Sequence, residues 1–420
     1  MQFEPHPLRS AVLGEVHARP FSAIEAPRRV IHFAFLTDAE HAVADRTAFA
    51  AFCEARGQRG PASGAKHHRI DLADCALRWE QHAEFTTYSW GFPSADRTPF
   101  ETPATIYMQR MRDLPQPGPH LVSVDLFYAN ERNQKNWQSA FDATSLAACR
   151  TIEGKAVAAT DFHVTADGFV RILLLGNKLS PLQAGALVLQ LLELETYRSL
   201  CLLGLPTAQT LQPAIRDFEQ RLAAITTEMT VASGLDANRP LLARLMELAG
   251  ELEAAASRAQ FRFGATWAYY QIVRARIEDL KEVPVSGLQT LSGFMERRLA
   301  PAVRTCTSVE DRQEKLSDKL SRAANLLRTR VDIELEEQNA DLLRGMNERT
   351  KMQLRLQQTV EGLSIAAITY YVAQLVFYAS GPFGLEDRPA GKWFKAGTVI
   401  VCALIVATIV RRVRRKNGPG

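Results

Sequence analysis

The 420-residue chain is long enough for two or three domains, and its hydrophobic share of 46% excludes a disordered protein. Its net charge is only +4, and acidic and basic residues are mixed along the chain, so no nucleic-acid partner is indicated. The six cysteines lie far apart without a C-x-x-C pair, which argues against a zinc ribbon, a redox motif or a disulfide framework.

The first distinctive segment is EVHARPF, at residues 15–21. Glu15, His17 and Arg19 alternate, so in an extended chain their side chains share one face, as in a catalytic site. Catalysis would need a nucleophile or a metal nearby, and the chain contains no G-x-S-x-G, H-E-x-x-H or GxxxxGK[ST] motif. We therefore expect no enzyme activity and no organic cofactor. Whether the protein binds a divalent cation is left open.

Two interpretations of this segment remain. In one, Arg19 forms a structural latch with a carboxylate such as Glu15 or Glu84. In the other, the segment contributes to a site that senses a small ligand or an anion. The candidate residues of that sensing site are Glu15, His17, Arg19, Glu84 and Tyr88.

Residues 1–178 are predicted to form a mixed α/β domain, because short β-branched and aromatic runs are separated by turn residues. Predicted strands cover residues 29–36, 67–72, 76–90 as one long or bulged strand, 121–128, and a hairpin around Asp167-Gly168. Predicted helices cover residues 39–56, 100–112 and 136–150.

Two polar features of this domain have competing interpretations. EFTTYSWGFP, at residues 84–93, is either the floor of a ligand site or a strand with one packed face. His67 and His68, close to Asp71 and Asp74, are either metal ligands or part of a solvated hairpin edge.

Strand signals disappear after Ser180-Pro181, a helix cap followed by proline at the first helical position. Helices are expected at about 181–203, 207–233, 239–282 and 286–305, so residues 179–307 form a region of helical hairpins. From Ser308 to Gln358 no proline occurs, and apolar residues recur with a spacing close to 3.6, which predicts one amphipathic stalk helix.

The carboxyl end contains two apolar runs, at residues 359–380 and 393–410, each close to the ~20 residues that span a bilayer. A basic tail at residues 411–420 follows the second run, and basic residues also precede the first. By the positive-inside rule both ends face the cytoplasm, and a short loop at residues 381–392 lies outside. The alternative is a pair of buried core helices.

Polar residues on one stripe of the first apolar run suggest a pore lining in a homo-oligomer. These candidates are Glu361, Ser364, Tyr371, Gln374 and Tyr378. The alternative is that they form hydrogen bonds between helices and anchor the helix at the membrane interface.

Three separated motifs carry a family resemblance. HPLR...EVHARPF at His6 to Phe21, EFTTYSWGFP at Glu84 to Pro93, and MNERTKMQLRLQQTVEGLSIAAITYY at Met346 to Tyr371 resemble the bacterial membrane-anchored family called domain of unknown function 3422. The resemblance covers essentially the whole chain. It implies a membrane anchor and no established activity.

The order of segments is similar to that of the CorA magnesium channel family, whose members are pentamers lined by their first spans. That resemblance implies oligomerisation and ion transport. The sequence departs from it where selectivity is set, because the first span ends in Tyr378-Ala379-Ser380 and lacks the Gly-Met-Asn signature. The Gly-Met-Asn at Gly345 to Asn347 precedes the span and is treated as coincidence.

The expected fold class is therefore α+β, with a cytoplasmic mixed α/β domain, helical hairpins, a stalk and two carboxyl-terminal spans in a bacterial inner membrane. The expected function is that of an oligomeric, CorA-like channel or transporter whose cytoplasmic domain senses a ligand or ion. A non-conducting anchor that displays a regulatory binding module or scaffold is the main alternative. An enzyme in the amino-terminal domain comes third.

Overall fold

The computed structural model describes residues 6, 9, 21–380 and 391–417, without the side chains of 391, 392, 394 and 413–417. The chain divides into two compact units. Unit 1 comprises Met1–Glu228 and Ala243–Ala324, and unit 2 comprises Met229–Leu242 and Asn325–Gly420.

Unit 1 is built on one nine-stranded mixed sheet with the order β2-β3-β4-β1-β5-β8-β7-β6-β9. The strands are β1 (Arg28–Leu36), β2 (His67–Asp71), β3 (Ala76–Gln81), β4 (Phe85–Pro93), β5 (His120–Asn130), β6 (Ala147–Thr151), β7 (Ala156–Val164), β8 (Val170–Gly176) and β9 (Val283–Pro284). β5 and β8 pair in parallel, and the other neighbours are antiparallel. The predicted mixed α/β architecture is thus confirmed, although β9 joins the sheet from outside the predicted range of residues 1–178.

Both faces of the sheet are covered, so β1 is buried on both sides. Ile31, Phe33 and Phe35 face a core that includes Trp79 and Trp90. Residues of α2 (Ala39–Glu54) and α3 (Ala104–Met108) complete this core. Three 3-10 turns lie in the same half of the chain, η1 (Gln109–Met111), η2 (Glu131–Asn133) and η3 (Trp137–Ala140).

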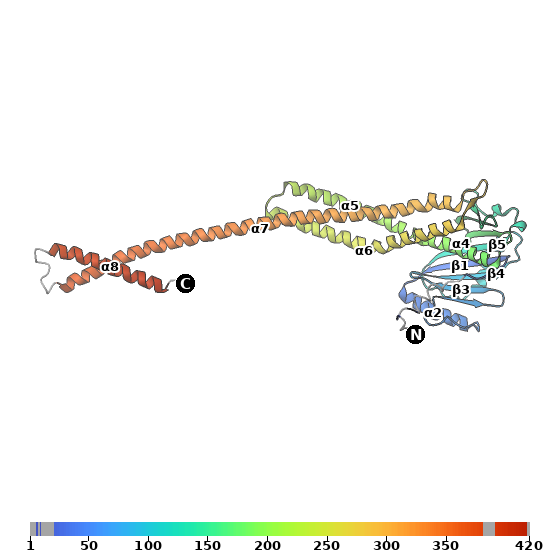
Figure 1. Ribbon diagram of the computed structural model, residues 1–420, viewed down its shortest axis with the longest axis horizontal. Helices are drawn as coiled ribbons and strands as arrows, with labels where there is room; N and C mark the ends of the chain where they lie inside the picture. The colour runs from blue at the N-terminus through green and yellow to red at the C-terminus, as the bar shows by residue number, and fades with distance from the viewer. Residues whose placement is uncertain (1–5, 7–8, 10–20, 381–390, 418–420) are drawn as a thin grey trace, which may run out of the picture. The chain divides into compact units, whose positions relative to one another are not determined.

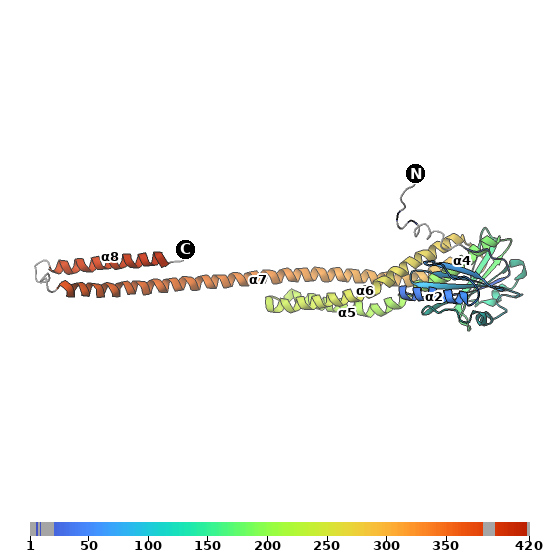
Figure 2. The same cartoon turned by 90° about the horizontal axis from the view of Figure 1, so that it is seen from below.

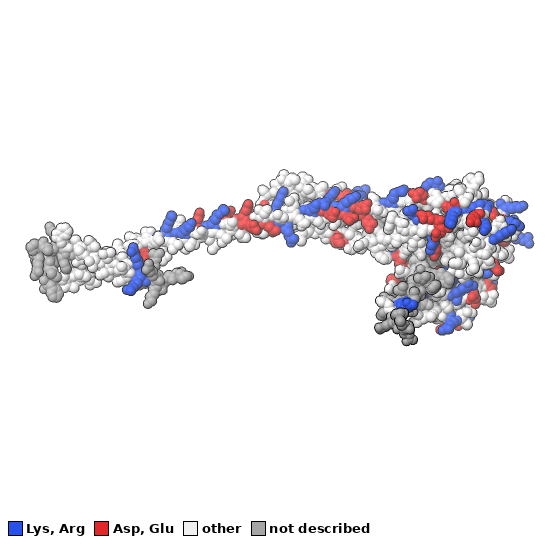
Figure 3. Space-filling model, in the orientation of Figure 1, with Lys and Arg blue, Asp and Glu red and all other residues white. Residues whose placement is uncertain are grey.

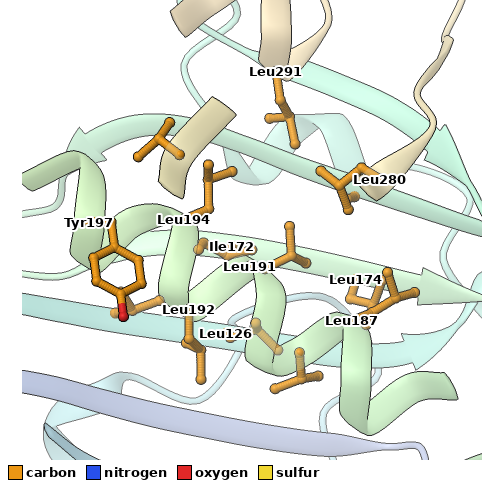
Figure 4. Close-up of a cluster of buried hydrophobic side chains, with 14 of the residues drawn as sticks. Leu126, Ile172, Leu174, Leu187, Leu191, Leu192, Leu194, Tyr197, Leu280 and Leu291 are labelled. Atoms are coloured by element: carbon orange, nitrogen blue, oxygen red, sulfur yellow. The ribbon is translucent and has the colours of Figure 1, made fainter. Parts of the chain in front are cut away.

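The opposite face of the sheet packs against α4 (Pro181–Leu202). In Figure 4, leucines of α4 lie over Leu126, Ile172 and Leu174 of the sheet, with Leu280 and Leu291 closing the cluster. The start of α4 is fixed by a capping box in which Ser180 accepts from the Gln183 amide and the Gln183 side chain accepts from the Ser180 amide. The predicted helix start at Ser180-Pro181 is therefore confirmed.

The remaining helices are α5 (Gly204–Val231), α6 (Leu235–Leu280), α7 (Leu291–Ser380) and α8 (Gly391–Asn417). The predicted break between residues 305 and 308 is wrong, because α7 continues through it. Cys306 is buried between Val303 and Val309 on one helix face, and this packing outweighs the modest helix propensity of the segment.

Three other predictions for the amino-terminal domain need correction. The long strand at 76–90 is two antiparallel strands, β3 and β4, and the His82 ring stacks on Phe85 at their turn. The helix predicted at 100–112 is reduced to α3 and η1. The helix predicted at 136–150 contains η3 and β6, because pairing with β7 overrides the helix propensity of Ala147-Ala148. The predicted hairpin around Asp167-Gly168 is confirmed as β7–β8, and β2 also pairs with β3 as an antiparallel hairpin.

Unit 2 contains the distal part of α7, helix α8 and the end of α5 with the start of α6. Within the described residues, α7 is the one helix that is long and apolar enough to cross a membrane by length and composition. Figure 2 shows α8 running beside the end of α7. Their contact buries Thr369, Ala373 and Ser380 of α7 with Cys402 and Val406 of α8.

The chain before β1 is tied to the start of α4. The Ile24 amide donates to the Pro181 carbonyl at 2.9 Å, and a Cβ on Gly185 would lie 1.8 Å from the Ser22 carbonyl oxygen. We predict that Gly185→Ala lowers the free energy of unfolding by about 1–3 kcal/mol through this overpacking. Chemical unfolding of the full chain in detergent measures the change.

The matched control is Gly250→Ala in α6, where an added Cβ meets no atom within 4 Å. Removing a helical glycine there should raise the free energy of unfolding by about 0.5–1 kcal/mol. Equal effects of the two substitutions would mean that the contact between Ser22 and Gly185 does not form.

Candidate functional site

The structure does not gather the predicted sensing residues into one site. Glu15, His17 and Arg19 lie outside the described residues. Glu84 precedes β4 and accepts from Arg262 of α6 at 2.5 Å. Tyr88 is fully buried on the α2 side of the sheet.

The Tyr88 hydroxyl belongs to a closed polar cluster. It donates to Asp45 of α2 at 2.5 Å, and the Trp79 indole N–H donates to the other oxygen of the same carboxylate at 2.8 Å. Burial raises the pKa of Asp45, and the two hydrogen bonds oppose that shift. Both donors are satisfied internally, so the arrangement of Tyr88 favours a packed strand over a ligand floor.

A pocket opens on the other face of the sheet, beneath the amino-terminal half of α4. We call it the arginine pocket, and its volume is about 100 Å³. It is lined by Ser22, Ala23, Ile24, Arg28, Val30, Arg69, Ala76, Leu77, Arg78, Ser89, Gly91, Gly185, Val188, Leu189 and Leu192. Ser22 is the residue directly after the EVHARPF segment.

Strand register explains how the polar groups of this pocket meet. Arg69 of β2 lies opposite Arg78 of β3. Ser89 of β4 lies between Arg78 on one side and His32 of β1 on the other. The four residues form one row across four strands on one face. Like charges directly opposite each other destabilise a sheet, so the Arg69–Arg78 pair needs compensation.

Two of the three arginines have their own carboxylates. Arg69 pairs with Asp71 at 2.7 Å, and Arg78 pairs with Glu80 at 2.7 Å. Arg28, which is half-buried, has no hydrogen bond or ion pair with any described residue. The pocket therefore carries one uncompensated positive charge within the described part of the chain.

The neighbouring Arg29 shows the contrast. It points to the opposite face, is fully buried, and donates to Asp125, to Asp96 and to the Thr102 carbonyl. Its charge is compensated by two carboxylates, as buried arginines require. Adjacent arginines on β1 thus differ in that only Arg29 has protein partners in the described residues.

His32 fixes the orientation of the Ser89 hydroxyl. The Thr196 hydroxyl donates to the Leu192 carbonyl at 2.8 Å, so its oxygen accepts from His32 Nε2 at 3.0 Å. His32 Nδ1 is then the acceptor for the Ser89 hydroxyl at 2.8 Å. The Ser89 oxygen consequently keeps its lone pairs for a donor in the pocket.

Burial, followed by the charge of Arg78, lowers the pKa of His32 from 6.5 to about 3. The imidazole is therefore neutral at pH 7 and a weak base. A Ser–His pair of this kind does not activate serine as a nucleophile, and it acts here as a positioning device.

Of the pocket residues, only Ser89 and Gly91 belonged to a sequence motif, EFTTYSWGFP. The alternations Arg69-x-Asp71 and Arg78-x-Glu80 place each ion pair on one strand face, which is a detectable signal. The meeting of Arg28 with them depends on the strand order β2-β3-β4-β1, which local patterns do not determine.

Four of the five predicted pore residues are exposed on α7. Tyr371 and Tyr378 are 68% and 81% exposed. The Ser364 hydroxyl donates to the Val360 carbonyl at 2.8 Å, and the Gln374 amide donates to the Tyr370 hydroxyl at 3.1 Å. Glu361 is half-buried. The buried residues that contact α8 lie on the opposite side of the helix.

Metal-binding groups are not evident in the described part of the chain, where no cluster of three or more His, Cys, Asp or Glu side chains has a suitable arrangement. His68 Nε2 instead contacts the Arg59 carbonyl at 2.7 Å. The divalent cation left open by the sequence has no site among these residues.

The lowered pKa of His32 predicts a pH dependence of stability. Between about pH 3 and 6.5 the unfolded chain binds a proton at His32 that the folded chain does not. The neutral His32 therefore contributes its full share to the free energy of unfolding above about pH 6.5, and this share decreases as the pH falls below that value. From about pH 7.5 to about pH 5, His32 should cost the folded state about 2 kcal/mol.

Chemical unfolding at the two pH values tests this. His32→Gln should reduce the pH-dependent loss by that amount while lowering stability at neutral pH, because its hydrogen bonds are disturbed. His163→Gln, at an exposed histidine, is the control and should keep the wild-type pH dependence. An unchanged pH dependence in His32→Gln contradicts the buried, neutral imidazole.

Comparison with known proteins agrees with the pattern of motifs along the chain. No curated protein and no solved structure matches the chain significantly. One family model, described as a protein of unknown function (DUF3422), matches residues 4–417. The match covers nearly the whole chain, and the protein therefore belongs to this family.

Proposed function

We propose that the protein is a membrane-anchored homo-oligomer in which the end of α7 crosses the bilayer and copies associate along one face of α7. Ion conduction along that face is its proposed activity. The observation that carries the proposal is the continuity of this face through unit 2, from buried residues near the turn between α5 and α6 to the exposed polar stripe.

The face begins in contact with the rest of unit 2. Leu327 and Val331 are buried, and the Arg330 guanidinium donates to the Met229 carbonyl at 2.8 Å. One turn further along, Glu334 accepts from the Gly234 amide at 2.9 Å and from the Asn238 side chain at 2.8 Å.

Beyond that point α7 has little cover. Residues 336–360 are exposed apart from the half-buried Gly345. At about 100° per residue, Leu342, Met346 and Val360 continue the face of Val331, and they are 54–64% exposed. A solvated single helix with an apolar face is only marginally stable, so an identical helix from another copy supplies the missing contact.

The same face continues into the apolar end of the helix. Ser364, Tyr371 and Tyr378 lie within about 60° of the direction of Leu342, and Gln374 borders them. Thr369, Ala373 and Ser380, which contact α8, lie about 180° away. In an oligomer joined through this face, the polar stripe points to the centre and α8 lies outside.

Charge along α7 supports insertion of its end. In unit 2, acidic side chains gather near Glu336 and Glu337 of α7. Arg344, Arg349 and Arg355 follow them before the apolar end of the helix, so the surface charge changes from negative to positive (Figure 3). Exposed Arg411 and Arg412 follow the apolar part of α8. Basic flanks on both helices support two spans with cytoplasmic ends, which is the topology we propose.

Cysteine cross-linking tests the association. All six native cysteines are described and buried, so a new exposed thiol is the reactive one. Met346→Cys should give covalent dimers on mild oxidation in membranes, because the proposed face brings the same residue of two copies together. Lys351→Cys, on the opposite side of the exposed segment, is the matched control. Equal cross-linking at both positions, or at neither, contradicts the proposed face.

Conduction is tested separately by cation flux into liposomes that contain the purified full chain. Gln374→Leu removes a polar group from the stripe and should lower the flux at least about tenfold, a barrier increase of about 1.4 kcal/mol. Leu375→Ile, at the neighbouring exposed position, should retain wild-type flux. Absence of flux in an oligomer that still cross-links through Met346→Cys rules out conduction.

The arginine pocket favours a second candidate, in which the oligomer does not conduct and anchors a regulatory binding module. Unit 1 contains a preformed concave site, as ligand-binding domains do. This candidate predicts cross-linking through α7 without cation flux.

A further inference from the structure

We infer that the arginine pocket binds a small monocarboxylate with a short apolar chain. The inference goes beyond the proposed function of unit 2 and does not depend on conduction. It rests on the charge, the polar groups, the apolar walls and the size of one pocket within unit 1.

Charge selects an anion and limits its valence. Arg69 and Arg78 are already paired with Asp71 and Glu80, whereas Arg28 has no partner among the described residues. One uncompensated guanidinium matches one carboxylate, and a planar carboxylate accepts from it with two parallel hydrogen bonds. A doubly charged phosphate would leave excess negative charge near Glu80.

The walls select the rest of the ligand. Val30, Val188 and Leu192 are buried side chains that line the pocket, with half-buried Ile24 beside them. An acyl chain in contact with them leaves water, and each buried methylene strengthens binding about fourfold. A volume of about 100 Å³ holds several water-sized groups, which suits a chain of a few carbons.

Ser89 adds a preference. Its hydroxyl hydrogen is committed to His32, so its oxygen accepts a hydrogen bond and does not offer one to a carboxylate. It suits a hydroxyl or amide donor on the ligand. A hydroxyl-substituted short-chain acid should therefore bind better than the plain acid.

Gly91 provides a sharp test because it lies among the lining residues, opposite Val30 and Ala76, and a Cβ there meets no atom within 4 Å. Gly91→Leu should fill the pocket without displacing the backbone. Replacing a strand glycine with a larger residue also tends to strengthen the strand, so the melting temperature should stay level or rise.

Isothermal titration calorimetry of the full chain in detergent, with isovalerate as the probe, measures binding. We expect isovalerate to bind, acetate to bind more than about tenfold more weakly, and neutral isovaleramide to bind at least about tenfold more weakly. Arg28→Gln and Gly91→Leu should each lose binding, whereas Arg132→Gln and Gly250→Leu, outside the pocket, should bind as wild type does.

The inference is overturned if the wild-type chain binds none of the carboxylates, or if both pocket variants bind isovalerate normally. Stronger binding of inorganic phosphate than of isovalerate overturns the ligand class. If Gly91→Leu fails to fold, Arg28→Gln decides the outcome. Absence of carboxylate binding to the wild-type chain, while cross-linking through Met346→Cys still occurs, counts against this site and leaves the proposed function of α7 unaffected.

Discussion

The structure depends on the burial of one apolar face of α7. Within unit 1 this face supplies Leu299, Val303, Leu316 and Leu320 to the packing of the helices, and all four are buried. Within unit 2 it is buried at Leu327 and Val331 and then continues exposed. Burying an apolar side chain contributes about 1.5–3 kcal/mol, so a row of uncovered ones is a strong drive for association. The proposed oligomer follows from that constraint.

A second constraint acts in unit 1, where several buried polar groups are held in closed clusters, whereas a few others, such as the Trp90 indole N–H, have no partner among the described residues. Asp45 holds Tyr88 and Trp79, His32 bridges Ser89 and Thr196, and Arg29 is enclosed by carboxylates. Unpaired buried groups are costly, and these clusters stabilise a single arrangement of the sheet. Arg28 stands out against this background, because it faces a pocket and has no partner in the described residues. An external anion satisfies it by the same rule.

The sequence allowed a good prediction of local structure where periodicity was strong. The helix start at Ser180, the amphipathic face after Ser308 and the β7–β8 hairpin all follow from patterns within about 20 residues. Prediction was wrong where distant pairing decides the conformation, as at Ala147–Thr151, which becomes a strand only because β7 lies beside it.

The candidate sites show the same division. The stripe on α7 is a property of one helix, so helical spacing was enough to find it. The arginine pocket is assembled from four strands, α4 and residues 22–24, and its key residue, Arg28, has no local signal. Glu84 and Tyr88 were assigned to one site because alternate residues of a strand share a face. In the structure β4 begins only at Phe85, and Glu84 forms an ion pair with Arg262 instead.

Light scattering of the detergent-extracted full chain, corrected for bound detergent, tests the central claim most directly. Burial of the α7 face between copies predicts a protein mass that is a defined multiple of 46.7 kDa. It also predicts that Leu342→Glu together with Met346→Glu reduces this mass to that of a single chain. A wild-type protein mass of 46.7 kDa, at concentrations where the protein is folded, would contradict the account.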